Sequence, residues 1–298
     1  MSLFDAFKYD GKRVVVVGAA TGMGNAAARL VQDAGAAELI ALDIAAVDIA
    51  GATTGTINLA DRASIEAAAA AVEGPIHALL SCSGVADGTP GIEKINFLGH
   101  RLFIELLIDS GKLGKGATIG LISSAAGLGW DTDEHLAILK EYLAIEDFDA
   151  ASEWALANGK GDYQWSKRAV NAYVATQAYP MLKRGIRINA ILPGPTNTPL
   201  AQANADTWLT FGADYREDLG IEASTPEEQA YPLVFLCSDA GRSISGQTVI
   251  SDAGLFASGL TDVFPSVSGI TKFLSGRISL DDLMAAFAAL APETPAAE

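Results

Sequence analysis

The sequence is poor in cysteine and histidine, and each shortage excludes a class of protein. Two cysteines, Cys82 and Cys237, cannot form the several disulfides of a small secreted scaffold, so a reducing, cytoplasmic environment is predicted. The three histidines, His77, His100 and His135, lack the spacing of metal ligands, so no metal is predicted. They are expected to be structural or surface residues.

Positive charge and long apolar runs are scarce as well. The chain has 20 Lys and Arg against 36 Asp and Glu, a formal net charge of −16. Because phosphate groups are bound by clustered Lys and Arg, neither nucleic acid nor an anionic membrane surface is an expected partner. The longest apolar runs, such as VVVV at 14–17, are too short to cross a bilayer. No basic and then apolar segment typical of a secretory signal opens the sequence.

Short β-branched runs that alternate with helical patterns dominate the chain. Strands are predicted at 13–18, 37–43, 55–61, 76–84, 117–124, 186–192 and 247–251. Helices are predicted between them at 25–35, 64–74, 95–107 and about 160–183. This alternation predicts an α/β fold with a doubly wound, parallel, seven-stranded sheet of the Rossmann type, covered by helices on both faces.

The domain organisation is predicted to be simple, because no repeat or linker divides residues 1–298. Two segments fall outside the alternation: a helical insertion at 127–161 and a C-terminal extension at 265–298. The extension contains an amphipathic helix at 279–291, whose acidic polar face favours packing or an interface over membrane binding. The Pro/Ala/Glu-rich end that follows it is expected to be frayed.

A glycine-rich turn links the first strand to the first helix. In VVVVGAATGMGNAAA, Gly18, Gly22 and Gly24 allow a tight turn and let a dinucleotide pyrophosphate approach backbone N–H groups at the helix N-terminus. Asp43 ends the second strand, nineteen residues after Gly24. A carboxylate there accepts hydrogen bonds from ribose hydroxyls and repels a 2′-phosphate, which favours NAD(H) over NADP(H). The alternative is that Asp43 only caps the strand.

A tyrosine and a lysine stand four residues apart in GDYQWSKRAV. On the predicted helix Tyr163 and Lys167 share one face, where they can act on the same proton. Such pairs also occur by chance in many helices. The meaning of this pair therefore depends on the other motifs of the chain.

Taken together, these motifs resemble those of the short-chain dehydrogenase/reductase family, in the family's order, from about residue 10 to 257. The matching features are Gly18-x-x-x-Gly22-x-Gly24, Asn96 in INFLGH, Ser124 in LISSAAG, Tyr163-x-x-x-Lys167, Pro193-Gly194 in ILPGPTNTP, and SGQTVISDAG near the end.

The resemblance implies a role for each of four residues. Tyr163 would be the catalytic acid/base, which requires its phenol pKa of about 10 to be lowered towards neutrality. Lys167 would stabilise the phenolate, together with the oxidised nicotinamide, and would hold the nicotinamide ribose. Ser124 would bind and orient the substrate oxygen. Asn96 would help to hold a water that relays protons through Lys167.

The resemblance also implies an NAD(H) site, in which Thr196 and Thr198 position the carboxamide. Its residues would be Gly18, Thr21, Gly22, Met23, Gly24, Asp43, Asn58, Leu59, Gly84, Tyr163, Lys167, Pro193, Gly194, Thr196 and Thr198. The chain departs from the family where Asn-Asn-Ala-Gly is usual. It has Ser81-Cys82-Ser83-Gly84 instead, and Ser81 can replace only part of an asparagine's hydrogen bonding.

Two variable segments lie near the motifs. Ser124 and Tyr163 are 39 positions apart, more than is usual in the family. This enlargement resembles the bacterial 3α-hydroxysteroid dehydrogenase/carbonyl reductase subgroup and coniferyl-alcohol dehydrogenases. The insertion could wall the substrate cleft, alter the helix face used for oligomer contacts, or be a solvated acidic hairpin. In the loop 200–222, three aromatic residues could form a substrate lid or be packing anchors: Trp208, Phe211 and Tyr215.

The resulting hypothesis is an NAD(H)-dependent oxidoreductase that acts on an apolar, steroid-like or aromatic secondary alcohol or ketone and forms a homodimer or homotetramer. A Rossmann-type methyltransferase would share the glycine turn but would not require Tyr163, Lys167 and Ser124. A non-catalytic NAD(H)-binding sensor or scaffold of the same fold is the other alternative. Cofactor binding without turnover of any alcohol would support it.

Overall fold

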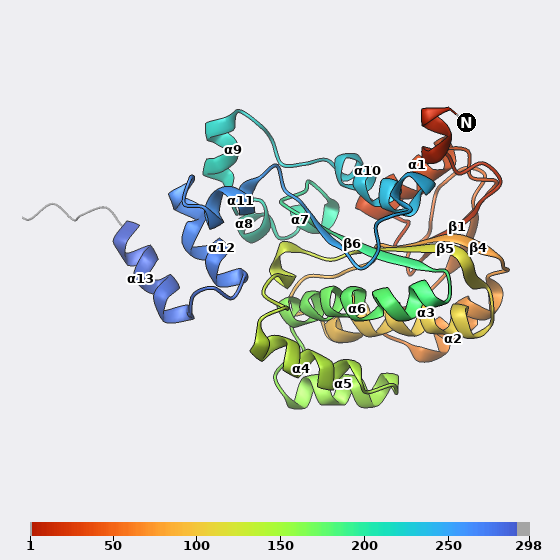
Figure 1. Cartoon of the computed structure of the whole chain (residues 1–298), viewed down its shortest axis with the longest axis horizontal. Coiled ribbons are helices and arrows are strands. Elements are labelled where there is room, and N and C mark those ends of the chain that lie inside the picture. The colour runs from red at the N-terminus through yellow and green to blue at the C-terminus, as the bar shows by residue number, and fades with distance from the viewer. Residues whose placement is uncertain (1, 291–298) are drawn as a thin grey trace, which may run out of the picture.

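A seven-stranded parallel sheet forms the centre of the protein (Figure 1). The structure, a computed structural model, describes residues 2–290. The strands are β1 (Arg13–Val17), β2 (Glu38–Asp43), β3 (Thr53–Thr56), β4 (Ile76–Ser81), β5 (Leu113–Ile122), β6 (Arg187–Pro193) and β7 (Thr248–Ser251). Their order is β3-β2-β1-β4-β5-β6-β7, and all neighbours are parallel. The predicted fold class is confirmed.

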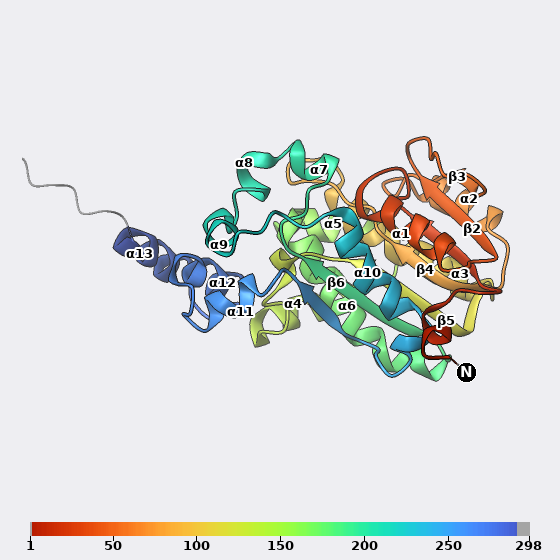
Figure 2. The same ribbon diagram turned by 90° about the horizontal axis from the view of Figure 1, so that it is seen from above.

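Helices cover both faces of the sheet, as Figures 1 and 2 show. One face carries α1 (Gly22–Asp33) and α10 (Pro226–Cys237), and the other carries α2 (Arg62–Ala71), α3 (Gly99–Asp109) and α6 (Tyr163–Lys183). The run of valines in β1 serves both layers, because successive side chains of a strand point to opposite faces. Val14 and Val16 pack in the α1/α10 layer, and Val15 and Val17 in the other.

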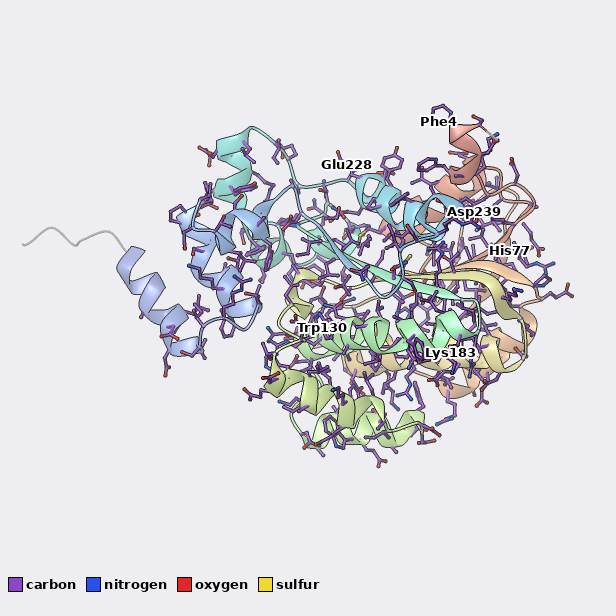
Figure 3. The ribbon with its side chains drawn as sticks, viewed as in Figure 1. Phe4, His77, Trp130, Lys183, Glu228 and Asp239 are labelled. Atoms are coloured by element: carbon purple, nitrogen blue, oxygen red, sulfur yellow. The ribbon has the colours of Figure 1, made fainter. Side chains whose placement is uncertain are left out.

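The insertion forms two helices, α4 (Asp133–Leu143) and α5 (Phe148–Ala157), which lie below α6 in Figure 1. Leu139 and Ala151 are 0% and 1% exposed and join the core on that side of the sheet. Trp130, labelled in Figure 3 before α4, packs against the same core. The insertion is therefore a third layer over the helices, with one side packed in the core and acidic residues such as Asp133 and Glu134 exposed on the other.

Short helices gather beyond one end of the sheet (Figures 1 and 2). The loop 200–222 contains α7 (Pro199–Gln202), α8 (Ala205–Trp208) and α9 (Ala213–Leu219), and the end of the chain contains α11 (Leu255–Leu260), α12 (Ser268–Leu274) and α13 (Leu280–Leu290). Residues 291–298, where a frayed end is predicted, lie outside the described residues. Within residues 2–290, no helix combines the length and apolarity needed to span a membrane.

Three predicted strands have wrong boundaries, and the fourth strand, expected at 76–84, ends at Ser81. The third strand was expected at 55–61 but ends at Thr56, because the Asn58 side chain accepts a hydrogen bond from Ala60 N at 3.0 Å and turns the chain. The fifth strand was expected at 117–124 but spans Leu113–Ile122, with a register shift against β4 near its start. That irregularity hides its first residues from a simple alternation pattern.

The packing of α10 on the sheet gives a stability prediction. Leu233 is fully buried, and a Cβ on Gly120 of β5 would lie 2.7 Å from its Cδ1. Leu233→Ala should lower the free energy of unfolding by about 2–5 kcal/mol, measured by urea denaturation. Leu280→Ala, which truncates a side chain that is 58% exposed, is the control. Equal unfolding midpoints for the two variants would contradict this packing.

Candidate active site

The glycine turn lies between the ends of β1 and β4, where the strand order of the sheet reverses. Gly18 has φ +86°, and a Cβ there would lie 2.6 Å from Ser83 N. A Cβ on Gly24 would lie 2.0 Å from Gly18 O. Larger residues would thus push apart the turn, α1 and the end of β4. In parallel sheets, ligands bind at this kind of reversal.

A cavity of about 280 Å³ opens at this turn. Ten of the residues predicted to bind cofactor line it: Gly18, Thr21, Gly22, Met23, Gly24, Asp43, Asn58, Leu59, Gly84 and Thr198. The N-terminus of α1 faces it through Gly22, at which a Cβ would meet no atom closer than Thr198 Cγ2 at 3.5 Å. The space beside the helix N-terminus is therefore open to an anionic group, and the residues present fit a dinucleotide.

Asp43 lies at the edge of this cavity and has two hydrogen bonds of its own. Its Oδ2 accepts from Ala20 N at 2.9 Å and its Oδ1 from Ala45 N at 3.0 Å. The carboxylate therefore holds the glycine turn and the end of β2 in place. Each oxygen keeps a second lone pair, so capping and ribose binding are compatible.

A second cavity, of about 310 Å³, adjoins the first and shares Met23 and Thr198 with it. Ser124, Tyr163 and Trp208 line it, and the ring centroids of Tyr163 and Trp208 are 5.2 Å apart. The complete lining is Met23, Ser123, Ser124, Ala125, Ala126, Tyr163, Pro193, Gly194, Pro195, Thr196, Thr198, Ala201, Thr207, Trp208, Phe211, Ile270 and Leu274.

Tyr163 and Lys167 occupy successive turns at the start of α6, where Asp162 caps the helix by accepting from Trp165 N at 2.8 Å. The ammonium of Lys167 is 5.6 Å from the centroid of the Tyr163 ring. Lys167 is 3% exposed, and its Nζ donates to the backbone oxygen of Ile122, the last residue of β5, at 3.1 Å. The lysine thereby connects the tyrosine to the carboxyl end of the sheet.

The pKa values of this pair follow from burial. Burial lowers the pKa of Lys167 to about 8. Burial also raises the pKa of Tyr163, and a hydrogen bond with the Ser124 side chain opposes that rise. The expected lowering of the tyrosine pKa is thus not produced by these residues alone. A further positive charge beside the phenol would be needed to bring it towards neutrality.

Asn96 lies in a π-helical turn, Lys94–Leu98, that precedes α3. Its Oδ1 accepts from Val85 N at 2.8 Å, and its Nδ2 donates to Val85 O at 3.1 Å. Asn96 Oδ1 and Lys167 Nζ would both lie 3.5 Å from a Cβ on Gly84. Asn96 therefore fixes the backbone next to the lysine, and such π-turns are frequent at functional sites.

The Ser81-Cys82-Ser83-Gly84 turn is braced by His100, a contact that the sequence did not indicate. The imidazole Nε2 is 3.0 Å from Ser83 O and Nδ1 bonds the Ser81 hydroxyl. Burial, and then the charge of Lys167, lower the pKa of His100 to about 4, so the ring is neutral at pH 7. A neutral ring can donate from Nε2 and accept at Nδ1, and it completes the bracing that Ser81 alone could not provide.

The structure separates the three aromatic residues of the loop 200–222. Trp208 and Phe211 line the second cavity, whereas Tyr215 does not. Tyr215 is 8% exposed, donates to Ala253 O at 3.0 Å and packs edge-on against Phe264. Its proposed place in the substrate lining is wrong, and it is a packing anchor.

The insertion also lies away from the second cavity. Helix α4 contacts α6 and helix α5 contacts the π-helical turn, and no residue of 127–161 lines the cavity. Of the two functional interpretations, the geometry favours coverage of the helix face over a wall of the cleft. The lining residues that were not predicted include Ile270 and Leu274 of α12, for which the only sequence signal is their spacing of four on a helix.

Comparisons with known proteins agree with this geometry. A family model described as enoyl-(acyl carrier protein) reductase matches residues 148–256. The chain is 31% identical to cis-4-hydroxycyclohexanecarboxylate dehydrogenase of Sinomonas cyclohexanicum and 28% identical to 3-alpha-hydroxysteroid dehydrogenase/carbonyl reductase of Comamonas testosteroni. Each match covers 82% of this chain and 96% of the relative. The crystal structure of 3-alpha-hydroxysteroid dehydrogenase from Pseudomonas sp. B-0831 complexed with NADH is similar at a TM-score of 0.67 and 25% identity, over 85% of this chain and 99% of that one.

The brace formed by His100 gives a prediction for pH. Its pKa of about 4 in the folded protein lies below the ordinary 6.5, so the unfolded chain binds an extra proton between these values. Stability from a neutral His100 is present above pH 6.5 and is lost as the pH falls towards 4. The loss should be roughly 3 kcal/mol in urea titrations.

The control for this prediction uses two substitutions of histidine. His100→Gln should flatten the dependence of the unfolding free energy on pH between 6.5 and 4. His77→Gln, at a partly exposed histidine of β4, should leave it as in the wild type. A wild-type slope retained in His100→Gln would show that His100 is not the group that titrates.

Proposed function

The chain belongs to the short-chain dehydrogenase/reductase family and is an oxidoreductase of the alcohol-acting kind, and from its site we propose that it is NAD(H)-dependent and interconverts an apolar secondary alcohol and ketone. The observation that carries this proposal is the junction of the two cavities at Met23 and Thr198. One cavity has the glycine turn and helix N-terminus that suit a dinucleotide. The other has Ser124 and Tyr163 in an apolar lining.

The cofactor would be held by the chain's own residues in two groups. The first cavity would take the adenosine and pyrophosphate, with Asp43 at the ribose and Gly22 beside the phosphates. The nicotinamide end would lie near Thr196 and Thr198, where the cavities join. When bound, the nicotinamide supplies or accepts the hydride, and its oxidised form adds a positive charge near the phenol.

The acid/base work would fall to Tyr163. In the direction of ketone reduction its hydroxyl would donate a proton to the substrate oxygen, and in alcohol oxidation its phenolate would accept one. Ser124, whose side chain lowers the pKa of Tyr163, would bind the same oxygen and set its distance from the phenol. An apolar lining around these two groups strengthens their hydrogen bonds by excluding water.

Lys167 would act on Tyr163 by electrostatics. Its ammonium lies 5.6 Å from the centroid of the Tyr163 ring, and a cation at that place would favour the phenolate over the phenol. Its lowered pKa of about 8 means that the lysine itself can give up a proton near neutral pH. Asn96, beside it at Gly84, would hold the water through which that proton reaches solvent.

We further propose that the protein forms a homo-oligomer. Apolar side chains remain exposed on helices of the sheet body, among them Tyr179 and Leu182 of α6 and Tyr231 of α10. Because α4 covers part of α6, an oligomer would use the surface of α6 that it leaves open. Light scattering coupled to size exclusion tests this proposal, and a monomer at micromolar concentration would contradict it.

The proposed acid/base role predicts the behaviour of Tyr163→Phe. The variant should lose at least about 10²–10⁴-fold in kcat/KM while it binds NADH as the wild type does. The assay follows reduced-cofactor formation with NAD⁺ and NADP⁺ against steroid, aromatic and aliphatic secondary alcohols. Tyr179→Phe, on the same helix at a side chain that is 72% exposed, is the matched control. Tight NADH binding without turnover of any substrate would instead support the non-catalytic sensor or scaffold.

The proposed role of Asp43 predicts cofactor preference. The wild type should bind NADH more tightly than NADPH, because a carboxylate at the ribose repels the 2′-phosphate. Asp43→Asn removes the charge but keeps one oxygen acceptor, and should reduce that preference by about tenfold, or ~1.4 kcal/mol. Titration of cofactor fluorescence measures both dissociation constants. Asp48→Asn, exposed on the same loop, is the control, and an unchanged ratio in Asp43→Asn would show that the aspartate only caps the strand.

A further inference from the structure

One wall of the second cavity comes from the C-terminal extension. Ile270 and Leu274 lie four residues apart on α12 and line the cavity together with Trp208 and Phe211 of the loop 200–222. The match to the family model ends at residue 256. This wall is therefore contributed by residues beyond the matched segment.

Close backbone packing fixes α12 relative to the segment that follows Ser124. Gly129 has φ +72°, and a Cβ there would lie 2.8 Å from the backbone oxygen of Leu274. Gly276 has φ +71°, and its Cβ would lie 2.6 Å from Thr132 Cγ2. Side chains at these glycines would push the end of α12 away from the cavity, so its position is well defined.

The same helix is joined to the aromatic loop through a small apolar cluster. Tyr215, Leu255 and Val267 are buried at its centre, and Phe211 and Ile270 pack against them. Phe211 and Ile270 thus share a packing cluster and also face the same cavity. The two walls support each other, and a change in one alters the space beside the other.

Charge is lacking in this lining. Among the described residues that surround the second cavity there is no Asp, Glu, Lys, Arg or His. Lys272, the basic residue of α12, forms an ion pair with Asp262 at 2.6 Å. A carboxylate that entered the cavity would lose its hydration and find no cation, which is strongly unfavourable.

We propose that Ile270 and Leu274 are specificity-determining residues that make the enzyme select uncharged cyclic ketones and alcohols and reject carboxylates of the same size. This inference rests on the proposed function and specifies its substrate class. The ring of the substrate lies between the aromatic wall of Trp208 and Phe211 and the aliphatic wall of α12. Its oxygen points to Ser124 and Tyr163, so substituents remote from the oxygen meet α12.

A matched pair of ketones tests the inference with the full chain and NADH. 4-tert-Butylcyclohexanone and 4-oxocyclohexanecarboxylate have the same ring and similar bulk at position 4 but differ in charge. The wild type should prefer the uncharged ketone by about 100-fold or more in kcat/KM. Ile270→Ala and Leu274→Ala should each lower kcat/KM for that ketone by about tenfold, because they remove contacts to its substituent, with a smaller effect on cyclohexanone.

Two further variants sharpen the result. Leu274→Lys places a cation in the wall of the cavity. It should shift the ratio of the kcat/KM values for the two substituted ketones by at least about tenfold in favour of the carboxylate. Val263 lies just before α12 and is 77% exposed, so Val263→Ala should leave kcat/KM for all three ketones unchanged. Equal selectivity in the wild type and the alanine variants would overturn the inference.

A binding measurement separates failure of this inference from failure of the proposed function. If no ketone is turned over, the proposed function fails. Calorimetric titration of the NADH-loaded protein with 4-tert-butylcyclohexanone still measures whether the wall formed by α12 contributes to the affinity for the ketone. Binding that weakens in Leu274→Ala but not in Val263→Ala would support the inference. Absence of binding to the wild type, or equal affinity in all variants, would contradict it.

Discussion

Lys167 is a buried cation, and much of the site is arranged around it. The residue is 3% exposed, and its ammonium donates to the backbone oxygen of Ile122 at the end of β5. A buried charge must be hydrogen-bonded or it loses its proton, and burial does lower the pKa of Lys167 to about 8. The polar side chains around Lys167 are compatible with a positive charge there. Asn96 faces it across Gly84, and His100 stays neutral partly because of it.

The position of Lys167 also sets the positions of the reacting groups. The lysine lies one turn after Tyr163, so fixing it on β5 fixes the phenol at the mouth of the second cavity. The Ser123 hydroxyl donates to the Lys167 carbonyl at 3.2 Å, which ties the strand that leads to Ser124 to the same helix. One helix therefore aligns Ser124, Tyr163 and Lys167, as an oxygen-binding and proton-transferring site requires. Around this centre, the loop 200–222 and α12 supply the apolar walls.

The features that depend on local sequence pattern could be predicted from the sequence. The valines of β1, the glycine turn and the four-residue spacing of Tyr163 and Lys167 are local, and the structure places them as the pattern indicates. The features that were missed depend on tertiary contacts. Nothing near His100 in the sequence shows that it bonds Ser81 and Ser83, because β4 and α3 bring these residues together only in the fold.

The contacts of apolar side chains outside the sheet also depend on the tertiary structure and could not be predicted from the sequence. The pattern of the loop 200–222 allows Tyr215 to line a pocket or to pack internally, and no contact was predicted for Ile270 or Leu274. In the structure Tyr215 packs inside a cluster with Leu255, whereas Ile270 and Leu274 face the cavity. The raised pKa of Tyr163 was missed for a related reason, since burial depends on the whole surrounding fold.

The central claim is that the two adjoining cavities bring a nicotinamide directly against a ketone beside Tyr163. Reduction of 4-tert-butylcyclohexanone with NADH deuterated at the transferred position of C4 tests it most directly, with the product analysed by mass spectrometry and NMR. Direct hydride transfer should give one deuterium per product molecule, at the carbinol carbon. A carbinol without deuterium, or no carbinol despite bound NADH, would contradict it.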